Sequence, residues 1–316
     1  ATASGPIYSL QGGSGVVFGG TRYVPVGDSA GVSTQLLSIS AKDGTVGRDL
    51  NLAGGWGLPT TPAGTEGLSR NGRTIVLASL QSGFSSPSSF LVVDRRTMRI
   101  ERTITLHGYF AYDALSPDAS RLFLVQYIHG AQNDLDHYVV RAYDLKTGRL
   151  QPGRIADRTQ KSWVMQGYPV TRTWSPGGRW AYTLYQNPGD GYPFIHALDT
   201  VRGVAHCIGI PLTNQNGIYN LVLSLHGRTL SVHWRSGRPF VNVNTSTWAV
   251  TPAHRSPFPW LWLAIGVSLL ACLSITFSWL ARGRWAAASP RWWPRRAAGS
   301  ASTTASPAPS SAASAR

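Results

Sequence analysis

The sequence is poor in several residues that define particular fold and site classes. It holds two cysteines and two methionines in 316 residues, and charged residues make up only 14% of the chain. Two cysteines cannot build a disulfide scaffold. We expect Cys207, in a strand, and Cys272, in an apolar run, to be buried fillers that do not meet. Scarce charge together with abundant Gly, Pro, Trp and Tyr favours short strands and tight turns over helices.

Motifs for cofactors, metals and catalysis are also lacking. No Gly-x-Ser-x-Gly elbow, P-loop or dinucleotide fingerprint occurs, so we expect no cofactor. The segment 129–137 carries two histidines and two aspartates, but it has neither EF-hand nor zinc spacing. We interpret it as a polar hairpin loop and expect no metal. His206 and Cys207 are neighbours in a strand, where they would point to opposite faces and form no dyad.

Acidic residues are half as numerous as basic ones, with 14 against 29, which gives a net charge of +15. Six arginines and no acid follow Ala281, so nine net charges belong to the rest of the chain. A moderately basic domain attracts anionic polymers or surfaces. These arginines are scattered through turns without a basic helix, however, and we expect no nucleic-acid partner.

One long apolar run stands out near the end of the chain. Trp260–Leu280 contains 21 residues without a charge, enough to cross a bilayer as a helix, and tryptophans flank it at both ends. A buried core helix is the alternative. A Pro-rich linker at 254–259 precedes the run, and a tail at 281–316 follows, first basic and then Ala/Ser/Pro-rich and disordered.

The arginines after this run predict the topology. Basic residues beside a span stay cytoplasmic, so we expect a cytoplasmic tail and an extracytoplasmic domain at 1–253. This orientation requires a secretory signal peptide, which we infer has been removed. The expected location is the cell membrane.

A short Ser-x-x-Gly-type phrase recurs through the domain. Its serines are 47, 59 and 49 residues apart, at Ser69, Ser116, Ser175 and Ser224. A period near 50 residues indicates a repeat architecture. An apolar strand follows each phrase, and a second strand then ends in Asp94, Asp144, Asp199 or Asn244.

A weaker first unit, with its turn at 9–12, brings the number of units to about five. Strands at this spacing without helices predict an all-β array. Radial closure would protect its edges, so we predict a β-propeller of about five to seven blades.

The phrases at 115–124 and 140–149 resemble the blade signature of YVTN/YncE-like and WD40-like propellers. The resemblance covers residues 60–250. The phrases at 169–173, 181–185 and 194–200 also resemble membrane-anchored propeller proteins of actinobacteria. The resemblance implies a propeller fold and leaves the function open, because such folds host both binding modules and enzymes.

Alignment on the serines predicts a charged ring around the central channel. Glu66, Asp113 and Arg172 each stand three residues before a serine, and the residues directly before the serines share their face of the strand. We interpret the three charges as candidate ligand-binding residues. A structural ion pair or a solvated channel lining is the alternative.

Aromatic residues precede the same strands and predict a rim around the channel mouth. The candidates are Trp56, Tyr109, Tyr168 and Tyr219, each close behind a glycine. Rigid aromatics beside a charged funnel suit a sugar, a peptide or another polar ligand. The alternative is that these rings cover the ends of the blades.

The sequence therefore predicts a membrane-anchored, extracytoplasmic propeller that acts as a non-catalytic binding module at the cell envelope, with an envelope protein or a polar or glycan ligand as partner. Two alternatives remain: a hydrolase or lactonase that uses the channel carboxylates, and a structural or assembly subunit of a membrane complex.

Overall fold

The computed structural model describes residues 8–10, 14–28, 31–82, 86–128, 137–157, 159, 164–187 and 191–253, which belong to one compact unit, Ala1–Arg255. The polar loop up to Asp136, Cys272, the linker, the expected span and the tail lie outside the described residues. In the part of the chain that is described, no helix has the length and apolar character needed to cross a membrane.

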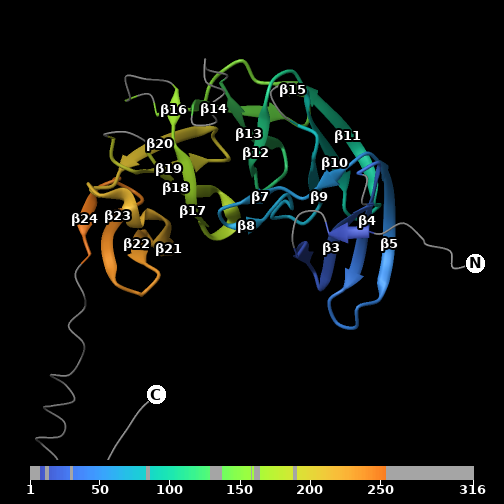
Figure 1. Cartoon of the computed structure of the whole chain (residues 1–316), viewed down its shortest axis with the longest axis horizontal. Helices are drawn as coiled ribbons and strands as arrows, with labels where there is room; N and C mark the ends of the chain where they lie inside the picture. The colour runs from blue at the N-terminus through green and yellow to red at the C-terminus, as the bar shows by residue number, and fades with distance from the viewer. Residues whose placement is uncertain are drawn as a thin grey trace, which may run out of the picture. The chain divides into compact units, whose positions relative to one another are not determined.

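The unit consists of consecutive antiparallel sheets, numbered here as blades 1 to 5 in chain order (Figure 1). Blade 1 contains β1 (Tyr8–Leu10), β2 (Val16–Phe18), β3 (Thr21–Asp28), β4 (Ser33–Ser40) and β5 (Val46–Ala53), and blade 2 contains β6 (Trp56–Gly57), β9 (Thr74–Ser79), β10 (Ser88–Asp94) and β11 (Arg99–Leu106). Blade 3 contains β12 (Phe110–Leu115), β13 (Arg121–Tyr127), β14 (His137–Asp144), β15 (Arg149–Leu150) and β16 (Met165–Gln166). Blade 4 contains β17 (Tyr168–Trp174), β18 (Trp180–Gln186), β19 (Phe194–Asp199) and β20 (Val204–Gly209), and blade 5 contains β21 (Leu221–His226), β22 (Thr229–Trp234), β23 (Pro239–Asn244) and β24 (Val250–Pro252).

Three smaller elements complete the described unit. Strands β7 (Thr60–Thr61) and β8 (Gly64–Thr65) form a hairpin inserted within blade 2. Two 3₁₀ turns, η1 (Pro176–Gly178) and η2 (Gln215–Asn220), lie in blade 4 and before blade 5. The prediction that residues 1–253 form an all-β domain of propeller-type blades is confirmed for the described residues, which contain five blades.

Serine closes the turn between the first and second strands of blades 2, 3 and 4. The Ser69 hydroxyl accepts a hydrogen bond from the Thr74 N–H at 3.0 Å, and Ser116 and Ser175 accept equivalent bonds from Arg121 and Trp180 at 2.9 Å. The third strand of blades 2 to 5 ends in an Asp or Asn whose side-chain oxygen accepts a hydrogen bond from the backbone N–H two or three residues further on. These residues are Asp94, Asp144, Asp199 and Asn244. Repeated local chemistry therefore sets the register of each blade.

Two predicted turns are placed differently. Ser224 lies within β21, paired with Ser231, and blade 5 turns instead through Gly227 and Arg228. The first unit turns at Gly19 and Gly20, while Ser9 and Leu10 lie in β1. Both phrases resemble the serine turn in sequence, but the apolar alternation of their strands fixes the pairing.

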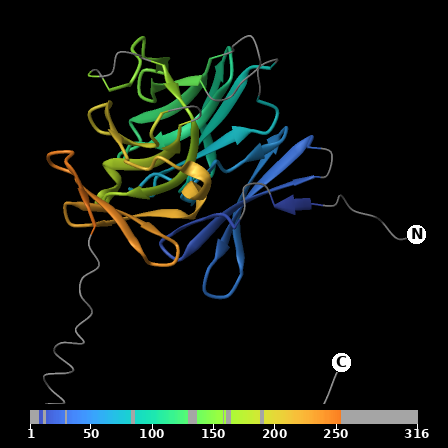
Figure 2. The same cartoon turned by 60° about the vertical axis from the view of Figure 1, so that its left-hand side comes forward.

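The hydrophobic core is divided among the contacts between successive blades. One cluster joins blades 1 and 2, another blades 2 and 3, a third blades 3 and 4, and a fourth blades 4 and 5. Among the described residues, none of these clusters joins blade 5 to blade 1. Figures 1 and 2 show the blades following one another in chain order along an arc.

The burial pattern shows that the array is open. The central strands β13 and β18 are buried on both faces, whereas β4 and β22 alternate between buried and half-buried residues. Alternation is typical of a sheet with one wet face. The predicted radial closure is therefore not found among the described residues, where no core cluster joins blade 5 to blade 1.

The two free faces differ in chemistry. The free face of blade 5 is polar, with residues such as Ser224, Ser231 and His233, as expected for a terminal repeat that meets water. The free face of blade 1 is mixed: the 54% exposed Val17 and the half-buried Leu37 lie on it together with Gln35 and Asp49, which form a hydrogen bond, and Val24 on this face is only 4% exposed.

Candidate functional site

The three predicted channel charges meet in one buried cluster around Arg172 in β17. Its guanidinium donates to the Asp113 carboxylate and backbone carbonyl, donates to the Thr183 hydroxyl at 2.7 Å, and lies 3.4 Å from Glu66. The side chains of Arg172 and Asp113 are 3% and 2% exposed. The cluster joins blades 2, 3 and 4 as a structural ion-pair network.

Local irregularities bring these groups together. The pairing of β12 with β13 shifts register between Tyr112 and Ala114, so Asp113 is the extra residue of a β-bulge. The β7–β8 hairpin interrupts blade 2 and leads directly to Glu66 (Figure 1). Gly67 then has a φ of 98°, a conformation that favours glycine, and its carbonyl accepts from the Val76 N–H at 2.7 Å.

Burial and neighbouring charges act in opposite directions in this network. Burial raises the pKa of Glu66, although Arg172 and a hydrogen bond from Trp174 lower it. Burial disfavours the charge on Arg172, but the carboxylates of Asp113 and Glu66 outweigh it and raise the pKa of the guanidinium. Arg172 therefore stays charged, and the folded chain holds the proton of Glu66 more tightly than a free carboxyl group would.

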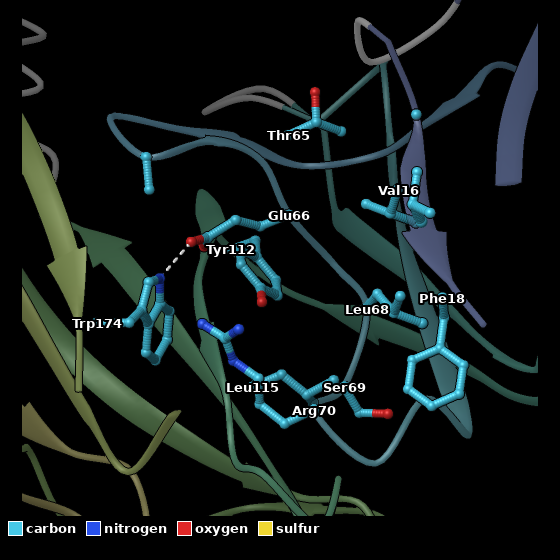
Figure 3. Close-up of a pocket in the computed structure, with 13 residues that line it drawn as sticks. Val16, Phe18, Thr65, Glu66, Leu68, Ser69, Arg70, Tyr112, Leu115 and Trp174 are labelled. Atoms are coloured by element: carbon cyan, nitrogen blue, oxygen red, sulfur yellow. Dashed lines mark hydrogen bonds between the residues drawn. The ribbon is translucent and has the colours of Figure 1, made fainter. Parts of the chain in front are cut away.

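A cavity of about 400 Å³ lies beside this network, at the end of the inner strands where the serine turns are. Figure 3 shows Trp174, Glu66 and Arg70 along one side, Val16, Phe18 and Leu68 along the other, and Tyr112 between them. Glu66 lines the cavity and accepts from the Trp174 indole N–H at 2.7 Å. Asp113 and Arg172 are not among its lining residues.

Sequence reasoning missed most of this cavity, although part of the signal was present. Leu68, Leu115 and Trp174 form the predicted column directly before the serines, and all three line the cavity. Arg70 belongs to the first serine turn, and its guanidinium lies 5.6 Å from the centroid of the Trp174 ring. The turn residues, which the sequence marks only as structural, thus contribute to the candidate site.

The predicted aromatic rim lies at the opposite end of the inner strands and does not line the cavity. Trp56 packs against the core between blades 1 and 2 and donates to the Ala53 carbonyl at 2.7 Å. Tyr109 packs against Tyr127 with the rings tilted by 32° and their centroids 5.0 Å apart. These two rings cover blade ends, which was the structural alternative.

Two rim residues remain accessible. Tyr168 is 44% and Tyr219 is 57% exposed, and the Tyr219 hydroxyl donates to the Gln186 side-chain oxygen at 2.6 Å. Gln186 is also the cross-strand partner of Tyr168. The structure therefore brings this pair together at the edge of blades 4 and 5, separately from the cavity.

Cys207 has a neighbour that sequence adjacency does not reveal. Its cross-strand partner is His196 rather than His206. Burial raises the pKa of the Cys207 thiol to about 12 and lowers that of His196 to about 4, so both groups are neutral and the thiol is a poor nucleophile. Over the described ranges, no cluster of three or more His, Cys, Asp or Glu side chains could hold a metal ion.

The Glu66→Gln variant is expected to change the pH dependence of stability. Because the folded chain holds the Glu66 proton more tightly than the unfolded chain, whose pKa is about 4.3, this stabilisation is complete below that pH and is lost as pH rises through the folded pKa. The stability of the wild type relative to the variant should therefore fall from pH about 4 toward neutrality, as measured by urea unfolding.

The control for this experiment is Glu101→Gln, a surface change at the ion pair with Arg73. It leaves Glu66 in place, so its free energy of unfolding should depend on pH as that of the wild type does. A constant difference between wild type and Glu66→Gln across this pH range would contradict the role given to Glu66.

No family model and no curated protein matches the chain. Among solved structures it is similar to the dihydro-heme d1 dehydrogenase NirN, with 15% identity, coverage of 79% of this chain and 48% of that one, and a TM-score of 0.48. It is also similar to the Dos1 propeller, with 10% identity, coverage of 74% of this chain and 58% of that one, and a TM-score of 0.42. A third similar structure is TolB from Acinetobacter baumannii, with 13% identity, coverage of 77% of this chain and 64% of that one, and a TM-score of 0.36. The chain spans 62% of the hydrazine synthase chain from Kuenenia stuttgartiensis, at 16% identity and a TM-score of 0.43. Because these TM-scores are below 0.5, the fold assignment rests on the chain's own sheet topology.

Proposed function

We propose that the five-bladed unit is a non-catalytic binding module for a polar small ligand, held at the cell envelope by a membrane span at 260–280. One observation carries this proposal. The cavity beside the ion-pair network is lined by a single carboxylate, Glu66, which already bonds to Trp174 and lies beside Arg172. A concave site with a few convergent polar groups and an apolar wall is typical of ligand binding.

The same cavity argues against the hydrolase alternative. Two-carboxylate hydrolysis needs an acid and a second carboxylate that both reach the substrate. The raised pKa of Glu66 suits a general acid, but its nearest acidic neighbour in the network, Asp113, is buried behind the cavity wall. A binding role needs no second carboxylate.

The experiment is a thermal-shift and calorimetric panel of sugars, sugar acids, amino acids and dipeptides on the full chain. We expect one class to raise Tm, and the cavity-filling variant Leu68→Trp to lose that shift while retaining the wild-type circular dichroism spectrum. Leu80→Trp, at an exposed position, is the control. Turnover of a lactone or glycan panel that is lost in Glu66→Gln would replace this proposal with the hydrolase.

The assembly alternative is favoured by the exposed Val17 and the half-buried Leu37 on the free face of blade 1. Exposed apolar residues on a sheet face can contact a protein partner, and in this alternative a partner in a membrane complex covers them. Stoichiometric co-purification that survives Leu68→Trp and is lost in Val17→Asp would favour assembly over ligand binding.

The proposed orientation places residues 1–253 outside the cell and the tail at 281–316 inside. It is supported by the arginines that follow the apolar run. A cysteine introduced in the tail should react with a membrane-impermeant reagent only after the cells are permeabilised. Labelling from outside intact cells would contradict this topology.

A further inference from the structure

The cavity presents one charge of each sign on the same tryptophan. Glu66 and Arg70 are the only charged residues among those lining it. Glu66 accepts from the Trp174 indole N–H, and the Arg70 guanidinium lies over the Trp174 ring (Figure 3). Because both groups contact one indole, a single small molecule can reach both.

Arg70 is held in place but is not neutralised. Its side chain lies against Gly178, where an added Cβ would collide with it, and on its other side it meets Trp174. Among the described residues, no carboxylate lies within ion-pair distance of Arg70, whereas Arg172 has two such partners. The side chain of Arg70 is exposed, so its free N–H donors can reach a ligand, and a guanidinium is suited to binding a carboxylate.

The charges of the site favour a ligand that has no net charge. Glu66, Asp113, Arg172 and Arg70 together carry two negative and two positive charges. A ligand with a net charge would leave one charge uncompensated in a partly buried site, which is unfavourable. A zwitterion keeps the balance, with its ammonium group at Glu66 and its carboxylate at Arg70.

The far wall of the cavity is apolar. It is lined by Val16, Phe18, Leu68 and Leu115. The Phe18 ring packs directly on Gly72, where it occupies the space that a Cβ would need. A volume of about 400 Å³ lies at the lower end of ordinary ligand sites, which suits one amino acid or a dipeptide. We propose that the cavity binds a zwitterionic amino acid with an apolar side chain, free or as a dipeptide; this rests on the proposed binding function.

The experiment is isothermal titration of the full chain with leucine, leucinamide, 4-methylpentanoate, glycine and leucyl-leucine. Leucinamide lacks the carboxylate, 4-methylpentanoate lacks the ammonium group, and glycine lacks the apolar side chain. Each loss is expected to weaken binding by about tenfold or more, for leucinamide and 4-methylpentanoate because a charge-assisted hydrogen bond is lost and for glycine because the burial of an apolar side chain is lost. Comparison of leucine with leucyl-leucine distinguishes a free amino acid from a peptide.

The variants assign each charge to its protein partner. Arg70→Gln should lower the affinity for leucine about tenfold and leave the affinity for leucinamide unchanged. Glu66→Gln should lower the affinity for leucine and leave the affinity for 4-methylpentanoate unchanged. Arg73→Gln, a surface arginine paired with Glu101 outside the cavity, is the matched control and should bind as the wild type does.

Two results would overturn the inference. One is that leucinamide binds as tightly as leucine, and the other is that Arg70→Gln binds leucine as tightly as the wild type does. Either would contradict a zwitterionic ligand. If no probe binds but another ligand of the panel does, and Leu68→Trp abolishes that binding, the proposed function stands and this inference fails. If nothing binds to the cavity, both fail.

Discussion

Replacing Arg172 with Met is expected to lower the free energy of unfolding by about 3–5 kcal/mol, as when one partner of a buried ion pair is removed. The variant leaves the carboxylate of Asp113, which is 2% exposed, without its cation. It also leaves Glu66 without its nearest positive charge and the Thr183 hydroxyl without its donor. Urea unfolding of the full chain at neutral pH, followed by circular dichroism, measures the loss.

Arg73→Met is the matched control, because Arg73 pairs with Asp94 and Glu101 while its side chain is 65% exposed. Surface pairs contribute about 0–1 kcal/mol. Adding Asp113→Asn and Glu66→Gln to Arg172→Met removes the uncompensated charges and should restore part of the stability. Equal losses in Arg172→Met and Arg73→Met would show that the network does not hold blades 2, 3 and 4 together.

Leu36→Ala is expected to destabilise the chain by about 2–5 kcal/mol, whereas Leu37→Ala should cost about 1 kcal/mol or less. These neighbours in β4 point to opposite faces of blade 1. Leu36 is fully buried in the cluster between blades 1 and 2, and Leu37 is half-buried on the free face. The pair therefore tests the open array with two changes of the same chemistry, measured by the same urea unfolding.

Similar losses in the two variants would contradict the open array, because a closed propeller would bury Leu37 against blade 5. The corresponding strand of blade 4, β19, shows what closure would look like, since Ile195 and Leu198 are buried in different inter-blade clusters. Val17→Ala, at a residue that is 54% exposed in β2, gives the baseline for a change on the free face.

Much of the fold could be predicted from local chemistry. The strands predicted to follow Ser69, Ser116 and Ser175 each begin five residues after the serine. The serine hydroxyl accepts a hydrogen bond from the N–H of that residue, and this bond fixes the turn. Ser224 misled the alignment, since Gly227 makes a shorter turn possible there. A turn motif in sequence is decisive only when the flanking strands can pair in the register that it demands.

The candidate site was predicted less completely. The common offset from the serines correctly indicated that Glu66, Asp113 and Arg172 lie close together. It did not show that Arg172 directs its donors to Asp113, Thr183 and Glu66, which makes the ring a buried network. Nor did it show the cavity, because the bulge at Asp113 and the β7–β8 hairpin break the strand alternation on which such predictions depend.

The sequence by itself determined the repeat, the strand order within each blade and the convergence of three charges, because these depend on turn hydrogen bonds and on alternation along single strands. Only the tertiary structure decided which charges face a ligand and whether the array closes. Both depend on contacts between blades. Arg70 from one turn reaches Trp174 two blades away, and among the described residues no core cluster joins blade 1 to blade 5. Such contacts follow from the packing of whole sheets and leave no periodic signal in the chain.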